Sequence, residues 1–304
     1  MNKPADPTPT SLPLGGTTYS WLHQKSLEEA LQSLAHAGFQ SAEIATAAPH
    51  LSSSAFGSYE RHALRRLLDQ LDIRPISINP GFLDINLLSN SSEFRALSEL
   101  LMTSEIELAA DLGAPFVVLI PGKRHSLCPA PADACLWTLE RILERLVTRA
   151  EQLGVTVALE TSPYGYLGSG DALLEIADAF DSDHLGITYD CANVLAFDDP
   201  AEGVKRVSRR LKLAHVSDTW RDRWAHTSPG RGEVDFAAYA AALAEIGFEG
   251  PTIYELADME DPDPRLADDI ATLEAAGWSR TAPPVLPTMS KSRTRSETKE
   301  RIKL

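Results

Sequence analysis

The chain has 304 residues and a formal net charge of -15, with 28 Lys and Arg against 43 Asp and Glu. Such an acidic protein repels a phosphate backbone, which argues against nucleic acid as a partner. No apolar run is long enough to span a membrane, no signal-peptide pattern opens the chain, and the 3 cysteines form no C-x-x-C pair. We therefore expect a cytoplasmic protein without disulfides or a membrane partner.

The two ends of the chain differ in composition from the rest. Residues 1–14 contain four prolines and few apolar side chains, which predicts a loose N-terminal lead-in. Residues 280–304 contain seven Lys and Arg against two Asp and Glu, a local charge of +5 that leaves -20 on the rest of the chain. This composition predicts a basic, disordered C-terminal tail. Residues 15–279 are then expected to form a single domain.

Between these ends, amphipathic stretches alternate with short apolar, β-branched runs. Helices are predicted near 26–37, 60–71, 94–112, 132–153, 170–180, 200–210, 235–247 and 264–276. Strands are predicted at 17–21, 41–45, 74–79, 116–121, 155–160, 185–190, 211–216 and 251–255. Glycines follow four of the helices, as C-caps do: Gly38, Gly113, Gly154 and Gly247. Eight such units predict an α/β fold, a (β/α)8 TIM barrel.

Four successive predicted strands carry a polar residue at or near the end: Glu160, Asp190, His215 and Glu255. Taken singly, each carboxylate is also typical of an exposed rim, and the histidine of a hydrogen-bonded core. In a barrel, however, these strand ends ring one mouth, so the side chains can converge. Converging carboxylates repel one another unless a cation lies between them. The set therefore predicts one divalent metal ion, Mn²⁺, Mg²⁺ or Co²⁺, with Zn²⁺ also compatible.

Four segments of the chain carry a resemblance to a known family: VALET, GITYDCAN, LAHVSDTWRDRWAHTSPGRGEVDF and TIYEL. Together they resemble the xylose isomerase-like barrel superfamily, which includes sugar isomerases and epimerases and endonuclease IV. The resemblance covers roughly residues 15–278 and implies that Glu160, Asp190, His215 and Glu255 bind the metal. In the ketose 3-epimerase branch the two matching glutamates also form an acid/base pair, which implies catalytic roles for Glu160 and Glu255.

The same resemblance bears on residues that would contact a substrate. Arg221 stands six residues after His215, where that branch has a sugar-binding arginine, although a solvated loop cation fits its position equally well. His226, in an H-x-x-x-G-x-G pattern, would contact the substrate or hold the loop. Glu43 would contact the substrate or line the barrel as a structural carboxylate. Asn193 stands where many relatives have a histidine.

Departures from the family pattern narrow the function. Endonuclease IV requires further histidines that this chain lacks, and Trp224 replaces a loop aspartate of the nuclease. We therefore expect a metal-dependent isomerase or epimerase that moves a proton on a small carbohydrate-like substrate through a metal-stabilised enediolate. A dehydratase or lyase of the same superfamily is the main alternative, ahead of a nuclease or a non-catalytic barrel subunit. Dimers and tetramers are common in the family, which leaves a homo-oligomer open.

Overall fold

The computed structural model describes residues 11–287 except 55, 82–83 and 259. Its strands are β1 (Leu12–Thr17), β2 (Ser41–Thr46), β3 (Arg74–Pro80), β4 (Phe116–Leu119), β5 (Thr156–Glu160), β6 (Leu185–Asp190), β7 (Leu211–Val216), β8 (Thr252–Tyr254) and β9 (Trp278–Ser279). Strands β1 to β8 pair in parallel in chain order, and β1 pairs with both β8 and β2. The sheet is therefore a closed eight-stranded barrel, with β9 beside the start of β1.

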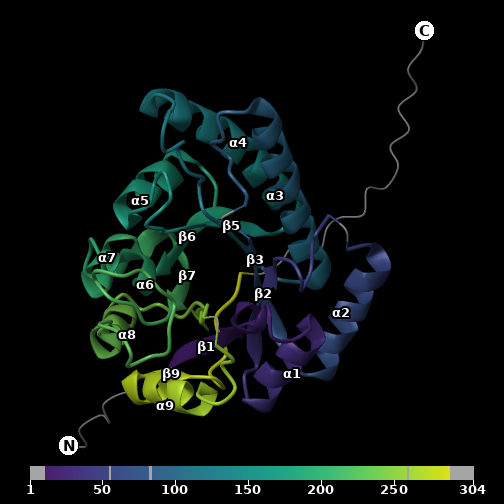
Figure 1. The fold of residues 1–304 in the computed structure, drawn as a ribbon, viewed down its shortest axis with the longest axis vertical. Helices are drawn as coiled ribbons and strands as arrows, with labels where there is room; N and C mark the ends of the chain where they lie inside the picture. The colour runs from purple at the N-terminus through teal and green to yellow at the C-terminus, as the bar shows by residue number, and fades with distance from the viewer. Residues whose placement is uncertain (1–10, 55, 82–83, 259, 288–304) are drawn as a thin grey trace, which may run out of the picture.

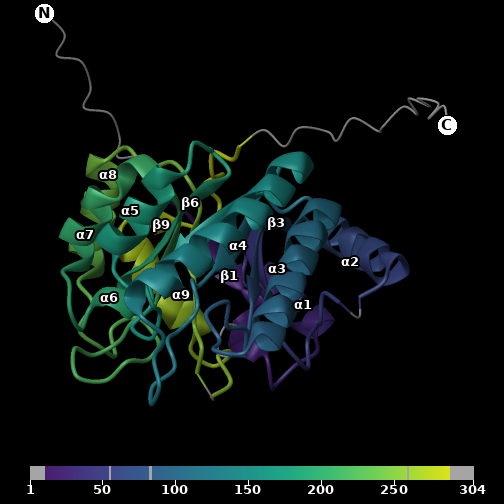
Figure 2. The same ribbon diagram turned by 90° about the horizontal axis from the view of Figure 1, so that it is seen from above.

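Helices surround the barrel and connect its strands (Figures 1 and 2). The α-helices are α1 (Leu27–His36), α2 (Ser58–Gln70), α3 (Ser92–Leu112), α4 (Ala132–Leu153), α5 (Gly170–Ala179), α6 (Cys191–Val194), α7 (Pro200–Arg206), α8 (Phe236–Glu245) and α9 (Leu266–Ala276). Two 3-10 helices, η1 (Thr18–Trp21) and η2 (Ser208–Arg210), complete the connections. The predicted (β/α)8 TIM barrel is confirmed. Two of the predicted caps, Gly113 and Gly154, end α3 and α4 with φ of +78° and +72°, a conformation that favours glycine.

The first predicted strand is wrong. Residues 17–21 were expected to be extended, but β1 lies at Leu12–Thr17 and the chain then turns into η1. The Thr17 side chain accepts a hydrogen bond from the Tyr19 backbone and so begins the 3-10 turn. All of β1 is buried although it contains two glycines and a proline, residues that weaken the sequence signal for a strand. The predicted boundary at residue 14 therefore falls inside β1.

The chain also remains ordered past residue 280, where the tail was predicted to begin. Arg280 donates a hydrogen bond to the Ala37 carbonyl and pairs with Glu274, and the Val285 amide donates to the Glu249 carbonyl at 2.8 Å. Leu286 packs against the apolar side chains at the N-terminal end of the barrel. The ordered body thus extends through 280–287, and the remainder of the predicted tail, 288–304, lies outside the described residues.

The barrel interior has an apolar floor and a polar mouth. The floor cluster consists of five buried side chains: Ile76, Phe116, Val118, Leu213 and Ile253. Successive residues of a strand face opposite sides, so residues two apart share a face. His215 therefore stands one layer above Leu213, and Glu255 one layer above Ile253. This alternation places polar side chains at the C-terminal ends of the strands, on top of a packed core. Within the described residues, no helix is both long and apolar enough to cross a membrane.

One buried carboxylate lies outside the barrel mouth. Glu105 of α3 is only 3% exposed, and its Oε1 accepts a hydrogen bond from the Ser53 hydroxyl at 2.6 Å. Its Oε2 has no hydrogen-bond partner among the described residues. Burial raises the pKa of Glu105 to about 7, although Ser53, Thr46 and Arg61 partly oppose the shift. Ionised Glu105 is therefore a cost to the folded state at neutral pH.

We predict that Glu105→Gln stabilises the protein above neutral pH. The raised pKa means that the folded state holds a proton that the unfolded state has lost, so wild-type stability falls as pH rises from about 4.5 to about 7. Glutamine has no such proton to lose. At pH 8 the variant should therefore exceed the wild type by about 3 kcal/mol in urea unfolding. The exposed Glu175→Gln is the control. Parallel pH profiles for wild type and Glu105→Gln would contradict the assignment.

Candidate active site

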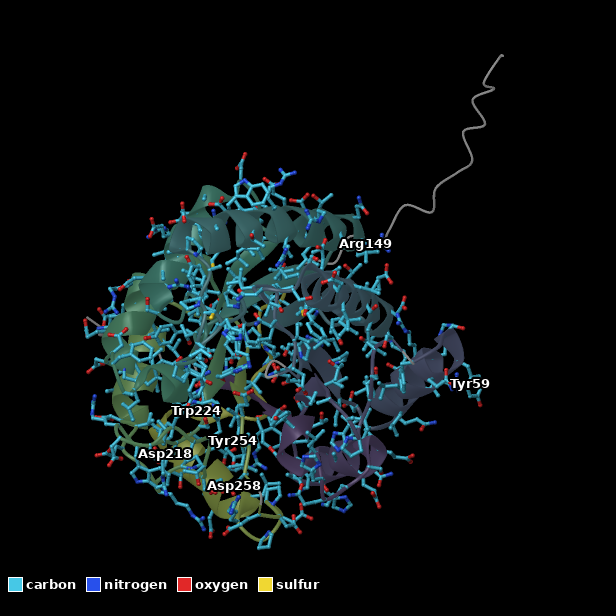
Figure 3. All side chains as sticks on the ribbon, turned by 45° about the horizontal axis from the view of Figure 1, so that its top comes forward. Tyr59, Arg149, Asp218, Trp224, Tyr254 and Asp258 are labelled. Atoms are coloured by element: carbon cyan, nitrogen blue, oxygen red, sulfur yellow. The ribbon has the colours of Figure 1, made fainter. Side chains whose placement is uncertain are left out.

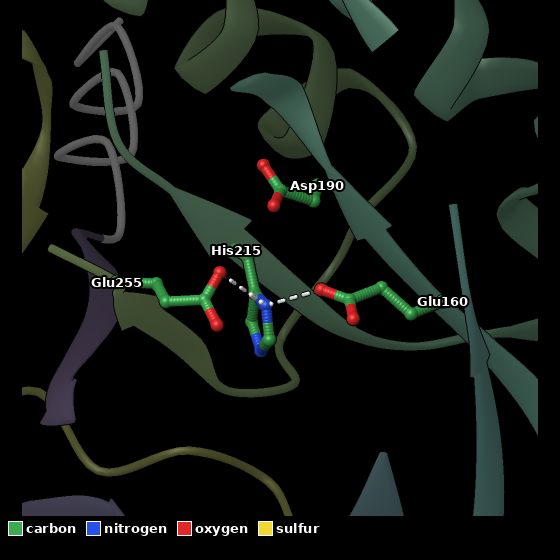
Figure 4. Close-up of side chains that lie close together, drawn as sticks. All are labelled: Glu160, Asp190, His215 and Glu255. Carbon is green, nitrogen blue, oxygen red and sulfur yellow. Dashed lines mark hydrogen bonds and ion pairs between the residues drawn. The ribbon is translucent and has the colours of Figure 1, made fainter. Parts of the chain in front are cut away.

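The four predicted strand-end residues meet at the mouth of the barrel (Figure 4). Glu160, Asp190, His215 and Glu255 each offer one ligand atom, and these atoms lie within 4.8 Å of one another. Glu160 and Asp190 end β5 and β6, His215 lies near the end of β7, and Glu255 follows β8 directly. All four residues are buried, with at most 8% of their surface exposed. We call these four residues the ligand cluster.

His215 lies at the centre of the ligand cluster. Its Nδ1 is 2.8 Å from Oε1 of Glu160 and 3.1 Å from Oε2 of Glu255 (Figure 4). Its Nε2 is 3.2 Å from Oε2 of Glu43, on the other edge of the ring. When Nε2 carries the hydrogen and donates it to Glu43, Nδ1 presents a lone pair to the cluster. A carboxylate behind the ring is the arrangement that orients a metal-binding histidine.

Glu43 is itself held by the neighbouring strand β3. Its Oε1 accepts a hydrogen bond from the Asn79 amide at 2.7 Å, and its Oε2 accepts one from the Ser77 hydroxyl at 2.7 Å. Asn79 also donates to Oε1 of Glu255 at 3.0 Å and so links the two carboxylates. Both oxygens of Glu43 are engaged by protein groups and the residue is fully buried. This environment favours the barrel-lining interpretation of Glu43, with His215 as its partner.

Burial and neighbouring charges shift the pKa values of the ligand cluster. Burial raises the pKa of Glu160 to about 8, despite the hydrogen bond to His215. Burial also raises the pKa of Asp190, with a further contribution from Glu255. For His215, burial favours the neutral ring, but Glu255, Glu43 and Glu160 outweigh it and raise its pKa well above its ordinary value. Each of these three shifts favours uptake of positive charge, which a proton or a cation supplies. For Glu255, burial raises the pKa, but His215 and His226 outweigh it and lower the pKa.

Two oxygens of the ligand cluster lack a hydrogen-bond partner. Oδ2 of Asp190 and Oε2 of Glu255 are buried and make no hydrogen bond within the part of the chain that is described. Glu255 Oε2 does lie 3.1 Å from His215 Nδ1, so the two groups are close without a well-directed hydrogen bond. A buried carboxylate oxygen without a partner is costly. Three carboxylates and one imidazole are a donor set that suits a divalent cation.

A second polar group, contributed by the β7–α8 loop, borders the cluster. His226 Nδ1 lies 3.3 Å from Oε2 of Glu255, and its Nε2 lies 3.7 Å from Oδ2 of Asp190. The Asn193 side-chain oxygen accepts a hydrogen bond from the Trp224 indole at 2.7 Å and lies 3.2 Å from His226 Nε2. Burial lowers the pKa of His226, but Asp190 and Glu255 outweigh it and raise the pKa to about 9. Asn193 thus orients the ring and the indole rather than facing open space.

Arg221 lies apart from the residues just described. It is exposed, and its guanidinium donates a hydrogen bond to the Leu195 carbonyl at 3.0 Å. Its backbone amide donates to Glu233 at 2.8 Å. These contacts hold the arginine along the outside of the loop, as the solvated-cation interpretation expects, and the structure does not bring it to the ligand cluster.

Asp218 organises the loop that carries His226. Its buried carboxylate accepts hydrogen bonds from four backbone amides: Thr219 at 2.9 Å, Gly230 at 2.8 Å, Gly232 at 2.8 Å and Val234 at 3.1 Å. A Cβ at Gly232 would lie 2.2 Å from the Thr219 carbonyl oxygen, which explains a glycine there. The motif D-x11-G-x-G in the sequence thus marks the hydrogen bonds by which Asp218 fixes the conformation of the loop.

We predict that Asp218→Ala destabilises the protein by about 3 kcal/mol, because it leaves several backbone amides without their charged acceptor. Chemical denaturation measures the loss. Asp222→Ala, in the same loop at an exposed position, is the matched control and should stay within about 0.5 kcal/mol of the wild type. Equal stability of the two variants would show that Asp218 does not hold the loop.

A cavity of about 860 Å³ opens beside the cluster. Its wall includes His226 and Trp224 of the β7–α8 loop, Tyr19 of η1, and Asp258 after β8. Burial raises the pKa of the Tyr19 hydroxyl, and the charges of Glu255 and Asp84 raise it further. A cavity of this size accommodates a small organic ligand with one end near the strand termini.

Sequence reasoning missed Ser77 and the supporting role of Asn79. Both belong to β3, where they lie on either side of Ile78, and an irregularity in the β2–β3 register just before Ser77 lets Ile76 face the barrel interior as well. Two polar residues spaced by two within an apolar strand indicate a polar inner face. This spacing of two polar residues is the sequence signal that could have predicted the hydrogen bonds from Ser77 and Asn79 to Glu43.

The sequence of the chain matches a known protein family. The family model described as the xylose isomerase-like TIM barrel matches residues 31–276. The chain therefore belongs to this family, and the resemblance expected from its motifs is confirmed.

Individual proteins share between 24% and 28% sequence identity with this chain in the three comparisons that follow. The chain is 28% identical over 245 residues to an uncharacterised protein of Methanocaldococcus jannaschii, covering 78% of this chain and 81% of the relative. It is 26% identical over 212 residues to an inosose isomerase of Bacillus velezensis, covering 64% of this chain and 72% of the relative. The solved structure of a D-tagatose 3-epimerase-like protein superposes with a TM-score of 0.75 at 24% identity, covering 87% of this chain and 99% of that chain. This last likeness concerns the fold.

Proposed function

We propose that the protein is a divalent-metal-dependent isomerase or epimerase of a small sugar or sugar-like hydroxy-carbonyl compound. The observation that carries the proposal is the pair of buried glutamates, Glu160 and Glu255, on either side of His215. Family membership and the similarity to an inosose isomerase support the same reaction class. In this proposal Glu160, Asp190, His215 and Glu255 hold the ion, and both glutamates also transfer protons.

The two glutamates approach from different strands and lie on opposite sides of the imidazole (Figure 4). A substrate carbon held between them would expose one face to Glu160 and the other to Glu255. One carboxylate takes the proton beside the carbonyl and the other returns a proton. Return to the opposite face of the same carbon inverts that centre, and return to the neighbouring carbon isomerises the compound.

The bound cation would polarise the substrate carbonyl and stabilise the negative charge that proton removal creates. The protein contributes the geometry around it. Glu43 keeps His215 Nδ1 directed at the cluster, and Asn79 keeps Glu255 in place. His226, held by Asn193, borders Glu255 and is positioned to contact a substrate hydroxyl. We assign Glu43 and Asn193 to positioning, and we give Arg221 no substrate contact.

A dehydratase or lyase is the second candidate. The same proton removal followed by loss of a β-hydroxyl gives dehydration, so one cluster supports both outcomes. The products distinguish the two: an isomer or epimer has the mass of its substrate, and dehydration lowers that mass by one water. Abasic-site cleavage would instead indicate a nuclease.

We predict that Asp190→Ala and His215→Ala lose the metal. Each substitution removes one of the four ligand atoms that the described residues bring together at this point. Elemental analysis of the purified proteins should show one divalent ion per chain in the wild type and little in either variant. Asp222→Ala should retain it. Undiminished metal in both ligand variants would refute the site.

We predict that Glu160→Gln keeps the fold but lowers kcat by roughly 10²- to 10⁴-fold, because glutamine cannot exchange a proton. Turnover of ketoses and inososes by the Mn²⁺-loaded protein in D₂O measures both the rate and the incorporation of deuterium beside the carbonyl. Glu105→Gln, a buried glutamate outside the cluster, is the control. Wild-type turnover by Glu160→Gln would show that this carboxylate does not carry the proton.

A further inference from the structure

The cavity beside the ligand cluster has two chemically different sides. On the inner side, His226 connects it to the carboxylates, because its Nδ1 lies 3.3 Å from Glu255. The outer side includes two arginines of the β7–α8 loop, Arg223 and Arg231. The cavity thus has His226, the neighbour of the carboxylate cluster, on one side and two arginines on the other, within a protein whose net charge is -15. Trp224 and Asp258, which line it, are labelled in Figure 3.

Arg223 is held in place without being neutralised. Its guanidinium carbon lies 3.6 Å from the centre of the Trp220 ring, a stacked cation–π contact. Paired backbone hydrogen bonds between Trp220 and Arg223 close the turn that presents both side chains. No carboxylate of the described residues forms an ion pair with Arg223. A stacked guanidinium keeps its in-plane donors available for an anion.

The other charged residues of the wall leave this cationic character intact. Arg231 lies 3.6 Å from Glu260, a long contact between side chains that are 52% and 68% exposed, where water weakens the attraction. Asp258, the carboxylate on the cavity wall, pairs with Arg265 at 3.2 Å. The negative charge on the wall therefore has a partner elsewhere, and Arg223 has none among the described residues.

We propose that the cavity binds a hydroxy-carbonyl substrate that carries an anionic group, a phosphate or a carboxylate, and that Arg223 binds this group. The inference rests on the proposed function and adds the substrate class. The carboxylates of the cluster repel an anion, so the hydroxy-carbonyl end lies at the strand termini and the anionic end at the outer wall. Tyr19, Trp220 and Trp224 supply apolar surface for the carbon chain between them.

Isothermal titration of the Mn²⁺-loaded protein tests the inference with three compounds that share one carbon skeleton. Fructose is neutral, fructose 6-phosphate carries a phosphate, and fructuronate carries a carboxylate. At least one of the two anions should bind roughly 10-fold or more tightly than fructose, and the one that does identifies the anionic group. Inorganic phosphate, titrated separately, measures the part of the affinity that needs no sugar.

Arg223→Gln should weaken binding of the preferred anion by roughly 10- to 100-fold and leave fructose unchanged, since a charged hydrogen bond is lost. Arg141→Gln is the matched control, because Arg141 is exposed on α4 and pairs with Glu144 away from the cavity. Equal affinity for all three compounds, no binding of either anion, or an unchanged anion affinity in Arg223→Gln would overturn the inference.

Titration requires no turnover, so the two proposals fail separately. Tight, Arg223-dependent binding of an anion without conversion of any sugar would support this inference and refute the proposed isomerase. Conversion of neutral ketoses with no preference for the anionic forms would do the reverse.

Discussion

Mutual repulsion among buried carboxylates at the barrel mouth is the constraint on which the rest of the site depends. Glu43, Glu160, Asp190 and Glu255 all surround or border one imidazole, and all are nearly inaccessible to water. Water cannot screen these charges, so each carboxylate must be neutralised, hydrogen-bonded or paired. The barrel can hold them together because the strands below are already fixed by an apolar floor. Folding free energy from that core offsets the cost of assembling the polar layer above it.

The polar side chains at the barrel mouth form successive layers, and each layer supplies hydrogen-bond partners to the layer inside it. His215 is oriented by Glu43, and Glu43 by Ser77 and Asn79. On the loop side, Asn193 holds both His226 and Trp224. Within the ligand cluster, two buried oxygens remain without a hydrogen bond among the described residues: Oδ2 of Asp190 and Oε2 of Glu255. Both residues belong to the group whose ligand atoms lie within 4.8 Å of one another, so a single cation at that point can serve both carboxylates.

The sequence predicted the features that have a local signature. A strand that ends in Glu160 or Asp190 is visible as an apolar run followed by a carboxylate, and the succession of such strands indicates the barrel.

Features that depend on long-range packing were missed. β1 has weak strand propensity and is extended because β8 and β2 pair with it. Residues 280–287 look like the start of a polar tail, yet Leu286 finds an apolar floor. Arg221 has the spacing of a sugar ligand, but the loop turns it toward Leu195. The number of residues between two positions does not determine where a side chain points once the chain has left the strand for a loop.

The division of the site into a cluster and an outer wall separates two kinds of selectivity. In the proposed function the cluster determines which bonds change, because its two glutamates and the cation that the cluster would hold act on any hydroxy-carbonyl group. It cannot distinguish compounds that share that group. The outer wall is carried mainly by the β7–α8 loop, which Asp218 fixes to the end of β7. A change at an outer position of this loop, such as Arg223, alters the charge of the wall, whereas His226 on the same loop lies against the ligand Glu255. Arg223 stacks on Trp220 and not on a cluster residue, so in our proposal it selects the substrate while the cluster holds the cation. This independence is the physical reason that one barrel mouth can serve many substrates with one chemistry.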